Sequence, residues 1–355
     1  MPGIQLNTGQ DMILHLVDGK LPTRVEIMYW TDGKLFNLSR LKAKTKVTTT
    51  SIIELQYADD NVVCAHSEED LQATLNTFAE AYEKPGLSLN IEKTKVLFQQ
   101  APAMPGIQLN GVTLENVDHF RYLDSHLSTK VNIDAEIQHR LSSASAAFLQ
   151  MKQRVFENRD IHRDTKVLVY KAIVLPTLLY ACETWTIYRQ HTQLLEQFHQ
   201  RCLLKILQIS WEDRQTNVRL LEEAKTTSIE VMLLCHQLRW TGHVVRMPNH
   251  RLPKQLLYSQ LKNGKCNVGG QEKRFKDGLK ANLKNCGIDT ENWEALALEC
   301  SNWRSAVTSS AVEFEEAQME GEREKHAKRK LRQATLTGST FCLETDVSIA
   351  EEHTD

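Results

Sequence analysis

Two short β-prone runs lie on either side of a pair of aspartates in the first fifth of the chain. Residues 52–57 and 61–64 are rich in aliphatic and β-branched side chains, and Asp59 and Asp60 stand between them. Runs of this kind, separated by a short polar turn, predict a β-hairpin. We therefore expect a hairpin that carries both aspartates at its turn.

A helix is predicted directly after this hairpin. Ser67 is a favourable N-cap, and the three acids that follow it suit the positive end of a helix dipole. Pro85-Gly86 stops the helix. Its apolar stripe, spaced by three and four residues, consists of Leu71, Leu75, Phe78 and Tyr82. Residues 87–91 then alternate between apolar and polar like a strand, and residues 96–98 begin another.

The pattern turns helical in the second third of the chain. Residues 107–114 still predict a hairpin, because Asn110-Gly111 tolerates the positive φ of a tight turn. From Asn132 onward, apolar residues recur at helical spacing. The predicted helices cover 133–155, 164–185 with a bend near Pro176, 191–209, 216–224, 228–246 and 312–333.

Composition places the chain among ordinary folded proteins. Hydrophobic residues make up 41% and charged residues 25% of the sequence, and the net charge is −2. No stretch reaches the roughly 18 consecutive apolar residues of a membrane helix, and the N-terminus lacks the pattern of a signal peptide. Eight scattered cysteines without a Cys-x-x-Cys pair are typical of reduced thiols. We expect a nuclear or cytoplasmic protein that is not secreted and does not use a membrane; its oligomeric state stays open.

The aspartate pair suits chemistry on nucleic acids. Polymerases use two divalent cations to stabilise the attacking and leaving oxygens of phosphoryl transfer, and Mg²⁺ prefers carboxylate ligands. Asp59 and Asp60, adjacent at a tight turn, can direct two carboxylates at one point, where Mg²⁺ or Mn²⁺ would bind. The alternative is a solvated turn, in which aspartates are common.

The residues around this pair resemble the reverse transcriptases of LINE-type (non-LTR) retrotransposons. Members of that family carry [FY]-A-D-D in the polymerase palm, and residues 57–60 read Tyr-Ala-Asp-Asp. A Gly-Leu-x-x-Asn-x-x-Lys-Thr segment follows, here at 86–94. A Phe-x-Tyr-Leu-Gly-Ser element of the primer-gripping region comes next, here at 120–125, with Asp124 in place of the glycine.

The resemblance implies roles for particular residues. It makes Asp59 and Asp60 the catalytic metal ligands and places Lys93 near the phosphates of the incoming nucleotide. Tyr57 and Tyr122 would lie against nucleic acid. For Lys93, a surface lysine on a strand edge is an equal alternative.

The helical part resembles the same family, and the resemblance spans residues 25–335. Further matching segments are 134–137, 175–185, 195–199, 238–247 and 251–258. The family's first palm motif, a strand with the third catalytic aspartate, is absent, since Asp11, Asp18 and Asp32 stand in no such context. The Gln-Gly motif, the fingers and the endonuclease are absent too. We therefore expect that this chain alone does not polymerise DNA.

Pattern and resemblance together predict an α+β protein. A partial polymerase palm, built as a small antiparallel sheet with a helix, is followed by a mostly α-helical thumb-like and C-terminal region. The predicted parts are a poorly defined N-terminus (1–24), a partial palm (25–126), a helical thumb-like region (127–225), a basic helical C-terminal region (226–335) and a disordered tail (336–355).

A basic stretch runs from Arg239 to Lys284, with eleven lysines and arginines against two acids. Such charge fits the phosphate backbone of an RNA template and a DNA primer, and aromatic residues within it can stack on bases. A solvated helical surface is the alternative. The candidate nucleic-acid-binding residues are Arg239, Trp240, Arg246, Arg251, Lys254, Lys273, Arg274 and Lys276.

Other chemistry fits the spacings poorly. The cysteine and histidines between 235 and 250 match no common zinc pattern, so we expect no zinc. His199 and Cys202 form a helical pair that is more often incidental than catalytic.

Three hypotheses for function follow. The first is a truncated RNA-directed DNA polymerase, inactive alone because its first palm motif is missing. The second is a non-catalytic nucleic-acid-binding remnant, and the third is a translated pseudogene product.

Overall fold

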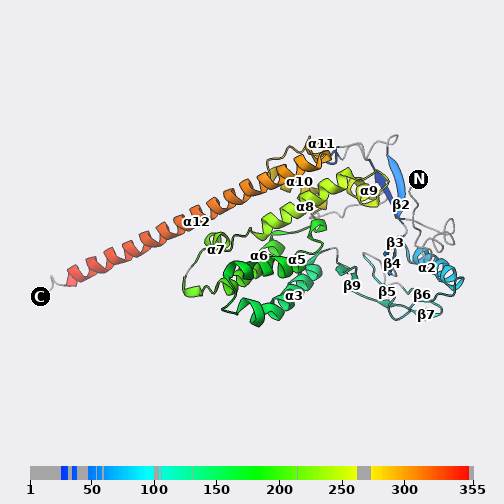
Figure 1. The fold of residues 1–355 in the computed structure, drawn as a ribbon, viewed down its shortest axis with the longest axis horizontal. Coiled ribbons are helices and arrows are strands. Elements are labelled where there is room, and N and C mark those ends of the chain that lie inside the picture. Colours follow the sequence, from blue (N-terminus) through cyan, green and yellow to red (C-terminus); the bar gives the residue numbers. More distant parts are fainter. Residues whose placement is uncertain are drawn as a thin grey trace.

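The protein combines many helices with several small sheets. The computed structural model describes residues 25–30, 34–37, 47–52, 54–57, 60–99, 104, 106–130, 132–213, 215–261 and 273–351. The short strands gather at one end of the molecule and the helices form its body (Figure 1). The long helix α12 (Cys300–Glu351) packs along this body and extends beyond it. This architecture is compatible with the predicted α+β class.

A three-stranded antiparallel sheet joins segments that are far apart in the sequence. Met28 pairs with Gln260 on one side and with Thr49 on the other. In the order β11-β1-β2, the strands are Ser259–Leu261, Val25–Tyr29 and Thr48–Ile52. A strand of the C-terminal region therefore completes a sheet whose other two strands lie in the segment assigned to the palm.

The predicted aspartate hairpin forms. β3 (Glu54–Tyr57) and β4 (Asp60–Val63) are antiparallel, and Tyr57 is paired with Asp60. Ala58 and Asp59 lie outside the described residues. The hairpin therefore has the register that places residues 58 and 59 between its two strands.

The helix after the hairpin also matches its prediction. It is α2 (Glu68–Glu83), and its N-cap Ser67 accepts a hydrogen bond of 3.1 Å from the amide of Asp70. Phe78 is buried and packs with Val63 of β4. The helix ends where Gly86 adopts a positive φ of 79°, as Pro85-Gly86 predicted.

The prediction of a strand at 87–91 is wrong. Residues 87–90 are irregular and residues 91–93 form a turn. Asn90 explains the difference, because its side-chain oxygen accepts a hydrogen bond from the amide of Lys93 (3.1 Å) and its carbonyl accepts one from Thr94 (3.0 Å). Local side-chain bonds of this kind compete with strand pairing. Leu89 and Ile91 nevertheless pack onto a small core.

Short strands complete this end of the molecule. The predicted hairpin at 107–114 forms, with Asn110 at φ 52° and Gly111 at φ 77° in its turn. The strands are β5 (Lys95–Val96), β6 (Gln108–Leu109), β7 (Val112–Thr113), β8 (Glu115–Asn116), β9 (His119–Tyr122) and β10 (Ser125–Ser128). β5 pairs with β8 in parallel, whereas β6–β7 and β9–β10 are antiparallel hairpins. Among the described strands, the single small sheet that the sequence predicted is thus divided into separate pieces.

The first helical core holds the segment between residues 134 and 233. Its buried side chains include Ile137, Tyr170, Leu178 and Leu203. The elements are α3 (Asp134–Met151), η2 (Lys152–Phe156), α4 (Arg163–Val169), η3 (Tyr170–Val174), α5 (Leu175–Leu178), η4 (Cys182–Thr184), α6 (Arg189–Leu207), η5 (Trp211–Asp213) and α7 (Asn217–Glu223). The predicted helices at 133–155, 191–209 and 216–224 agree with α3 plus η2, α6 and α7.

The helix predicted at 164–185 ends early. Pro176 has no amide hydrogen, and the helix widens into the π-helical turn η3 directly ahead of it. The helix stops at Leu178, and Ala181 has a left-handed φ of 59°. Residues 182–184 therefore form a separate turn, η4.

A second core lies around α8 and the helices that follow it. Trp293 and Trp303 are its largest buried side chains, and Leu35 from the N-terminal region joins it. Its helices are α8 (Ile229–Arg246), α9 (Leu252–Tyr258), α10 (Phe275–Asn285), α11 (Trp293–Leu298) and α12. α8, as predicted at 228–246, contributes residues to both cores, because Ile229 and Leu233 belong to the first. α8 therefore joins the two cores.

The C-terminal helix is longer than the sequence predicted. α12 begins at Cys300 and runs to Glu351, through most of the segment 336–355 that we assigned to a disordered tail. Among the described helices, none combines the length and the apolar character that a membrane crossing requires.

Candidate functional site

The aspartate hairpin presents its tip to solvent. Asp60 is exposed at the start of β4, and 64% of Tyr57 is exposed at the end of β3. Asp59, the other predicted metal ligand, lies outside the described residues. Within the described part of the chain, Asp60 does not belong to a cluster of three metal-ligating side chains. The described geometry thus offers one accessible carboxylate at this hairpin.

The predicted primer-gripping residue Tyr122 lies beside this hairpin. Its hydroxyl donates a hydrogen bond of 3.2 Å to the carbonyl of Leu55 in β3. Burial raises the pKa of Tyr122, and the negative charge of Asp60 raises it further. Tyr122 and Asp60, which are far apart in the sequence, are therefore neighbours in the structure.

The turn of the β9–β10 hairpin is fixed by a network of charges. Leu123 and Asp124 have positive φ values of 46° and 64°. The carboxylate of Asp124 accepts a hydrogen bond of 2.8 Å from Arg140 on α3, and it also pairs with Arg121. The bond from Arg140 is the main reason why the pKa of Asp124 is lowered. The aspartate that replaces the family's glycine therefore anchors this turn.

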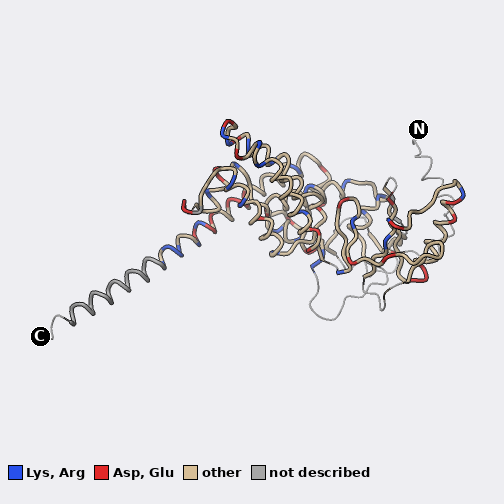
Figure 2. Tube along the Cα trace, turned by 90° about the horizontal axis from the view of Figure 1, so that it is seen from below, with Lys and Arg blue, Asp and Glu red and all other residues tan. Residues whose placement is uncertain are grey.

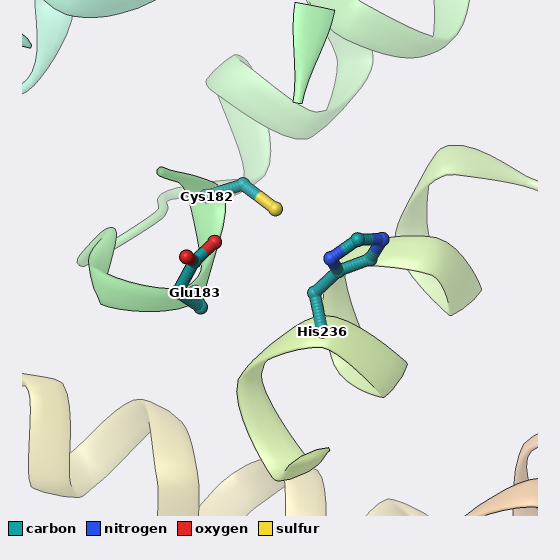
Figure 3. A group of neighbouring side chains, drawn as sticks. All are labelled: Cys182, Glu183 and His236. Carbon is teal, nitrogen blue, oxygen red and sulfur yellow. The ribbon is translucent and has the colours of Figure 1, made fainter. Parts of the chain in front are cut away.

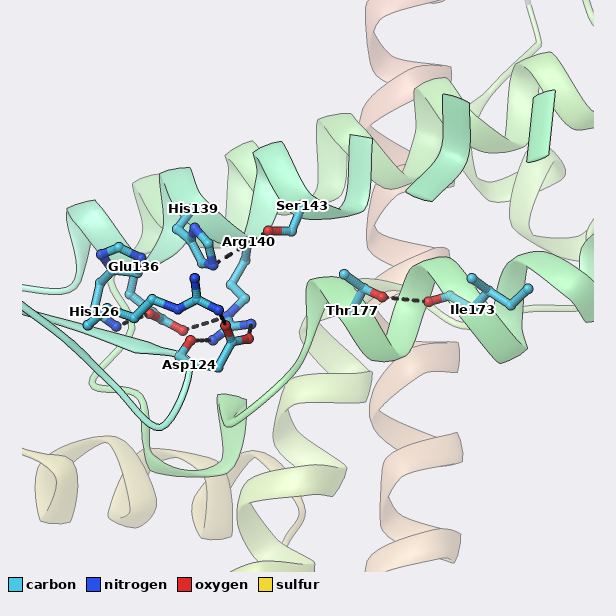
Figure 4. Close-up of polar contacts among 9 residues, drawn as sticks. Asp124, His126, Glu136, His139, Arg140, Ser143, Ile173 and Thr177 are labelled. Carbon is cyan, nitrogen blue, oxygen red and sulfur yellow. Dashed lines mark hydrogen bonds and ion pairs between the residues drawn. The ribbon is translucent and has the colours of Figure 1, made fainter. Parts of the chain in front are cut away.

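Arg140 connects the hairpin to the helical body. It is 2% exposed, and its Nε donates to Glu136 Oε1 at 2.6 Å (Figure 4). The other oxygen of Glu136 accepts from the amide of His126 in β10, also at 2.6 Å. The guanidinium lies 4.6 Å from the ring centre of Tyr180. Two carboxylates and an aromatic ring thus hold a buried cation at the base of α3.

Lys93 lies in the turn that Asn90 stabilises. Its side chain is exposed, and it stands on a turn instead of the strand edge that the sequence suggested. Its proposed place near nucleotide phosphates stays a prediction.

Several predicted nucleic-acid-binding residues make contacts within the protein. Arg246 Nη1 donates to the carbonyl of Ala297 at 2.6 Å, and Lys254 Nζ donates to that of Met247 at 2.9 Å. Three more behave similarly: Lys273 Nζ donates to Ile187 O at 3.0 Å, Lys276 Nζ donates to Ser259 O at 2.9 Å, and Arg274 Nε pairs with Asp277 at 3.3 Å. Burial lowers the pKa of Lys276 to about 8. These groups hold helices and connections in place.

Among the predicted basic residues, Arg239, Arg251, Lys273 and Arg274 are exposed. Trp240 is partly buried, and its ring centre lies 5.6 Å from that of His243. Basic and acidic residues are mixed over the helical body in Figure 2. The basic stretch in the sequence therefore spreads over several helices and does not form one continuous face in this view.

The predicted thiol–histidine pair lies in the core. His199 is fully buried, and its Nδ1 shares a hydrogen bond of 2.8 Å with the Tyr170 hydroxyl. Burial raises the pKa of Cys202 to about 12, which disfavours a nucleophilic thiolate. A group that the sequence analysis missed consists of Cys182, Glu183 and His236. No spacing rule could have found it, because His236 is more than fifty residues from the other two.

Comparison with known proteins identifies relatives of the chain. It is 25% identical over 275 residues to an uncharacterised transposon-derived protein of Caenorhabditis elegans, an alignment that covers 74% of this chain and 97% of that protein. It is 27% identical over 185 residues to the RNA-directed DNA polymerase from the mobile element jockey of Drosophila funebris, and 24% identical over 183 residues to that of Drosophila melanogaster. No family model and no solved structure matches the chain.

The extent of these matches limits what they show. The jockey alignments cover about half of this chain but only 20% of each polymerase. The transposon-derived protein is matched over nearly its whole length. The chain is thus similar to a transposon-derived protein and to part of two retrotransposon reverse transcriptases, which confirms the resemblance that its motifs indicated.

Proposed function

We propose that this chain is a partial reverse transcriptase that binds primer–template nucleic acid through a palm-like part and a thumb-like helical part. The hydrogen bond between Tyr122 and Leu55 carries the proposal. It sets the hairpin that matches the primer-gripping element against the strand that leads to the aspartate pair. A primer terminus held by the β9–β10 hairpin would therefore lie close to the β3–β4 hairpin, which carries the aspartate pair.

The helical part supports this arrangement. Arg140 joins the turn of the β9–β10 hairpin to α3 and so links the element that resembles the primer grip to the helical part. The relatives named as RNA-directed DNA polymerases make an RNA template and a DNA primer the expected ligands. Exposed Arg239 and Arg251 would contact the phosphate backbone.

Asp59 and Asp60 would hold a divalent cation. The exposed carboxylate of Asp60 fits a hydrated Mg²⁺ or Mn²⁺, because these ions take oxygen ligands and retain water. The cation would supply charge stabilisation for phosphoryl transfer. Two-metal chemistry in the family uses a third aspartate from the first palm motif, and these 355 residues contain no such motif. We therefore propose that the chain alone binds primer–template without extending it.

Primer extension tests the catalytic part of the proposal. The purified chain is incubated with an RNA template, a labelled DNA primer, nucleotides and either Mg²⁺ or Mn²⁺. We expect no extension above the level of the Asp59→Asn variant. Extension that disappears in Asp59→Asn and Asp60→Asn would show that the chain is a complete polymerase.

Fluorescence anisotropy with the same labelled primer–template tests the binding part. We expect affinity that falls steeply as salt rises, because binding releases counterions from the phosphates. Arg239→Gln combined with Arg251→Gln should weaken binding, whereas substitution of Arg159, an exposed arginine outside the basic stretch, by Gln should not. Absence of binding, or binding that ignores salt, would favour a pseudogene product without a nucleic-acid ligand.

A further inference from the structure

A thiol, a carboxylate and an imidazole meet where the connection after α5 crosses α8. Cys182 and Glu183 lie in η4, and His236 lies on α8 (Figure 3). The three side chains turn toward one another, and their ligand atoms all lie within 4.8 Å of each other. In the described part of the chain, this is the group of three side chains that could hold a metal ion.

The backbone fixes the two η4 ligands in place. Ala181 takes a left-handed conformation (φ 59°), and the amide of Cys182 then donates to the carbonyl of Leu179 at 3.2 Å. This abrupt end to the helix turns Cys182 inward, where it is fully buried, and leaves Glu183 half-buried beside it. The turn thus presents two neighbouring side chains to the same side.

α8 is held against this turn by the residue next to His236. The side-chain amide of Gln237 is buried and donates to the carbonyl of Trp185 at 2.9 Å and to that of Cys182 at 3.4 Å. Its oxygen accepts a bond of 2.7 Å from Asn282 on α10. His236 therefore faces Cys182 and Glu183 on a fixed helix, and the site does not depend on a mobile loop.

We propose that Cys182, Glu183 and His236 bind one zinc ion, with solvent as the fourth ligand. Cysteine, histidine and carboxylate are the ligand types of zinc sites, and a tetrahedral ion holds its ligands about 3.5 Å apart. The three ligand atoms lie within 4.8 Å of one another, and side-chain rotation would have to bring them to that spacing when the ion binds. A thiolate and a carboxylate together balance the charge of Zn²⁺, and the proton of the thiol leaves to the buffer.

The burial of the three ligands defines the character of the site. Cys182 is closed off from solvent, whereas His236 is exposed, so the ion would enter from the His236 side and keep one position open to water. The ion would link the η4 turn of the first core to α8, which contributes residues to both cores. The site is independent of the aspartate hairpin.

Cobalt binding to the full chain tests the site, because a Co²⁺–thiolate bond absorbs light and Co²⁺ bound to oxygen ligands alone lacks that absorption. We expect the chelator-treated chain to bind one Co²⁺ with a sulfur-to-cobalt band, and Zn²⁺ to displace it. Cys182→Ser should abolish the band. His236→Gln and Glu183→Gln should weaken binding at least tenfold. Zn²⁺ should also raise the melting temperature of the unmodified chain but not that of His236→Gln.

Matched controls separate this site from general metal binding. Cys235→Ser and His243→Gln change the same residue types on the same helix, and both should give the sulfur-to-cobalt band and the affinity of the unmodified chain. Cys182 is buried and its variant can unfold, so exposed His236→Gln decides the outcome. A missing sulfur-to-cobalt band in the unmodified chain, or unchanged affinity in His236→Gln and Glu183→Gln, would overturn the proposal.

Discussion

Arg140 Nη1 donates a hydrogen bond of 2.8 Å to Asp124 Oδ2, which joins a tight β-turn to a buried cation on α3. Asp124 stands at a φ of 64°, where glycine is usually favoured. The side chain thus compensates for a backbone position that an aspartate adopts less readily. It also occupies the place of the glycine in the family's Phe-x-Tyr-Leu-Gly-Ser element.

Substitutions at Asp124 should separate the backbone effect from the charge effect. Asp124→Ala removes a partner of a buried arginine and keeps a side chain at positive φ, so we expect a loss of about 1–3 kcal/mol in the free energy of unfolding. The estimate is modest because the carboxylate is 39% exposed. Asp124→Gly loses the same ion pair but relaxes the backbone, and should be about 1 kcal/mol more stable than Asp124→Ala.

Urea unfolding measures these differences, and Asp118→Ala is the matched control. Asp118 is exposed in the same segment, just ahead of β9. Its removal should change stability little. If Asp124→Ala proved as stable as the unmodified chain, the ion pair with Arg140 would have no net role in holding the turn.

Local sequence signals predicted the elements whose causes are local. The aspartate hairpin, α2 with its Ser67 cap, the Asn110-Gly111 turn and α8 all form where their patterns indicate. Each depends on residues within one or two turns of each other. The failure at 87–91 is also local, because alternation alone does not reveal that Asn90 caps a turn.

Contacts between distant segments could not be read from the sequence. β11 pairs with β1 across more than two hundred residues, and no periodicity in either strand indicates its partner. Lys254 and Lys276 belong to the basic stretch of the sequence, but in the structure their ammonium groups donate hydrogen bonds to backbone carbonyls. The cluster at Cys182 and His236 likewise exists only through the packing of η4 on α8. Site chemistry that depends on tertiary packing therefore required the structure.

Gly242 on α8 is predicted to be intolerant of any side chain. A Cβ at this position would lie 2.1 Å from Nε1 of Trp303, whose indole donates to the carbonyl of Leu238 at 2.9 Å. Both groups are buried, so the tryptophan cannot move away without losing that bond. We expect Gly242→Ala to lower the free energy of unfolding by about 1–3 kcal/mol despite the better helix propensity of alanine.

Gly278 on α10 provides the opposite case. The nearest atom to a Cβ there is Lys273 Cε at 3.6 Å, an ordinary contact with a flexible side chain. Gly278→Ala should therefore stabilise the chain by about 0.5–1 kcal/mol. Thermal and urea unfolding of both variants check the pair. Equal effects at the two glycines would mean that α12 does not pack on α8 as the structure has it.

His199 should make stability depend on pH in the mildly acidic range. Burial lowers its pKa to about 4, while a histidine in an unfolded chain has a pKa of about 6.5. Between about pH 4 and about pH 6.5, this histidine is therefore protonated in the unfolded chain and neutral in the folded chain. The free energy of unfolding should therefore be unaffected above about pH 6.5 and fall by up to about 3 kcal/mol as the pH drops to about 4.

The free energy of unfolding is measured as a function of pH for the unmodified chain and for His199→Gln, to test whether His199 causes this slope. The variant lacks the titrating group, so its stability should change less between about pH 6.5 and pH 4, even if it starts lower. His243→Gln, an exposed histidine, should retain the slope of the unmodified chain. An unchanged slope in His199→Gln would mean that other groups cause the acid sensitivity.

Substitutions of Lys276 and Arg251 should have opposite effects on stability and on nucleic-acid binding, although both residues belong to the basic stretch. Lys276 Nζ donates to Ser259 O at 2.9 Å and is largely withdrawn from solvent, whereas Arg251 is exposed ahead of α9. Lys276→Met should lower the free energy of unfolding by about 1 kcal/mol and leave the salt dependence of primer–template binding unchanged. Arg251→Gln should leave stability unchanged and reduce the slope of log affinity against log salt by about 0.7–0.9, the value for one lost phosphate contact.

Unfolding and anisotropy on the same preparations measure both quantities, and Arg159→Gln should alter neither. A reduced salt slope in Lys276→Met, at unchanged stability, would instead place Lys276 on the nucleic acid and contradict its structural role.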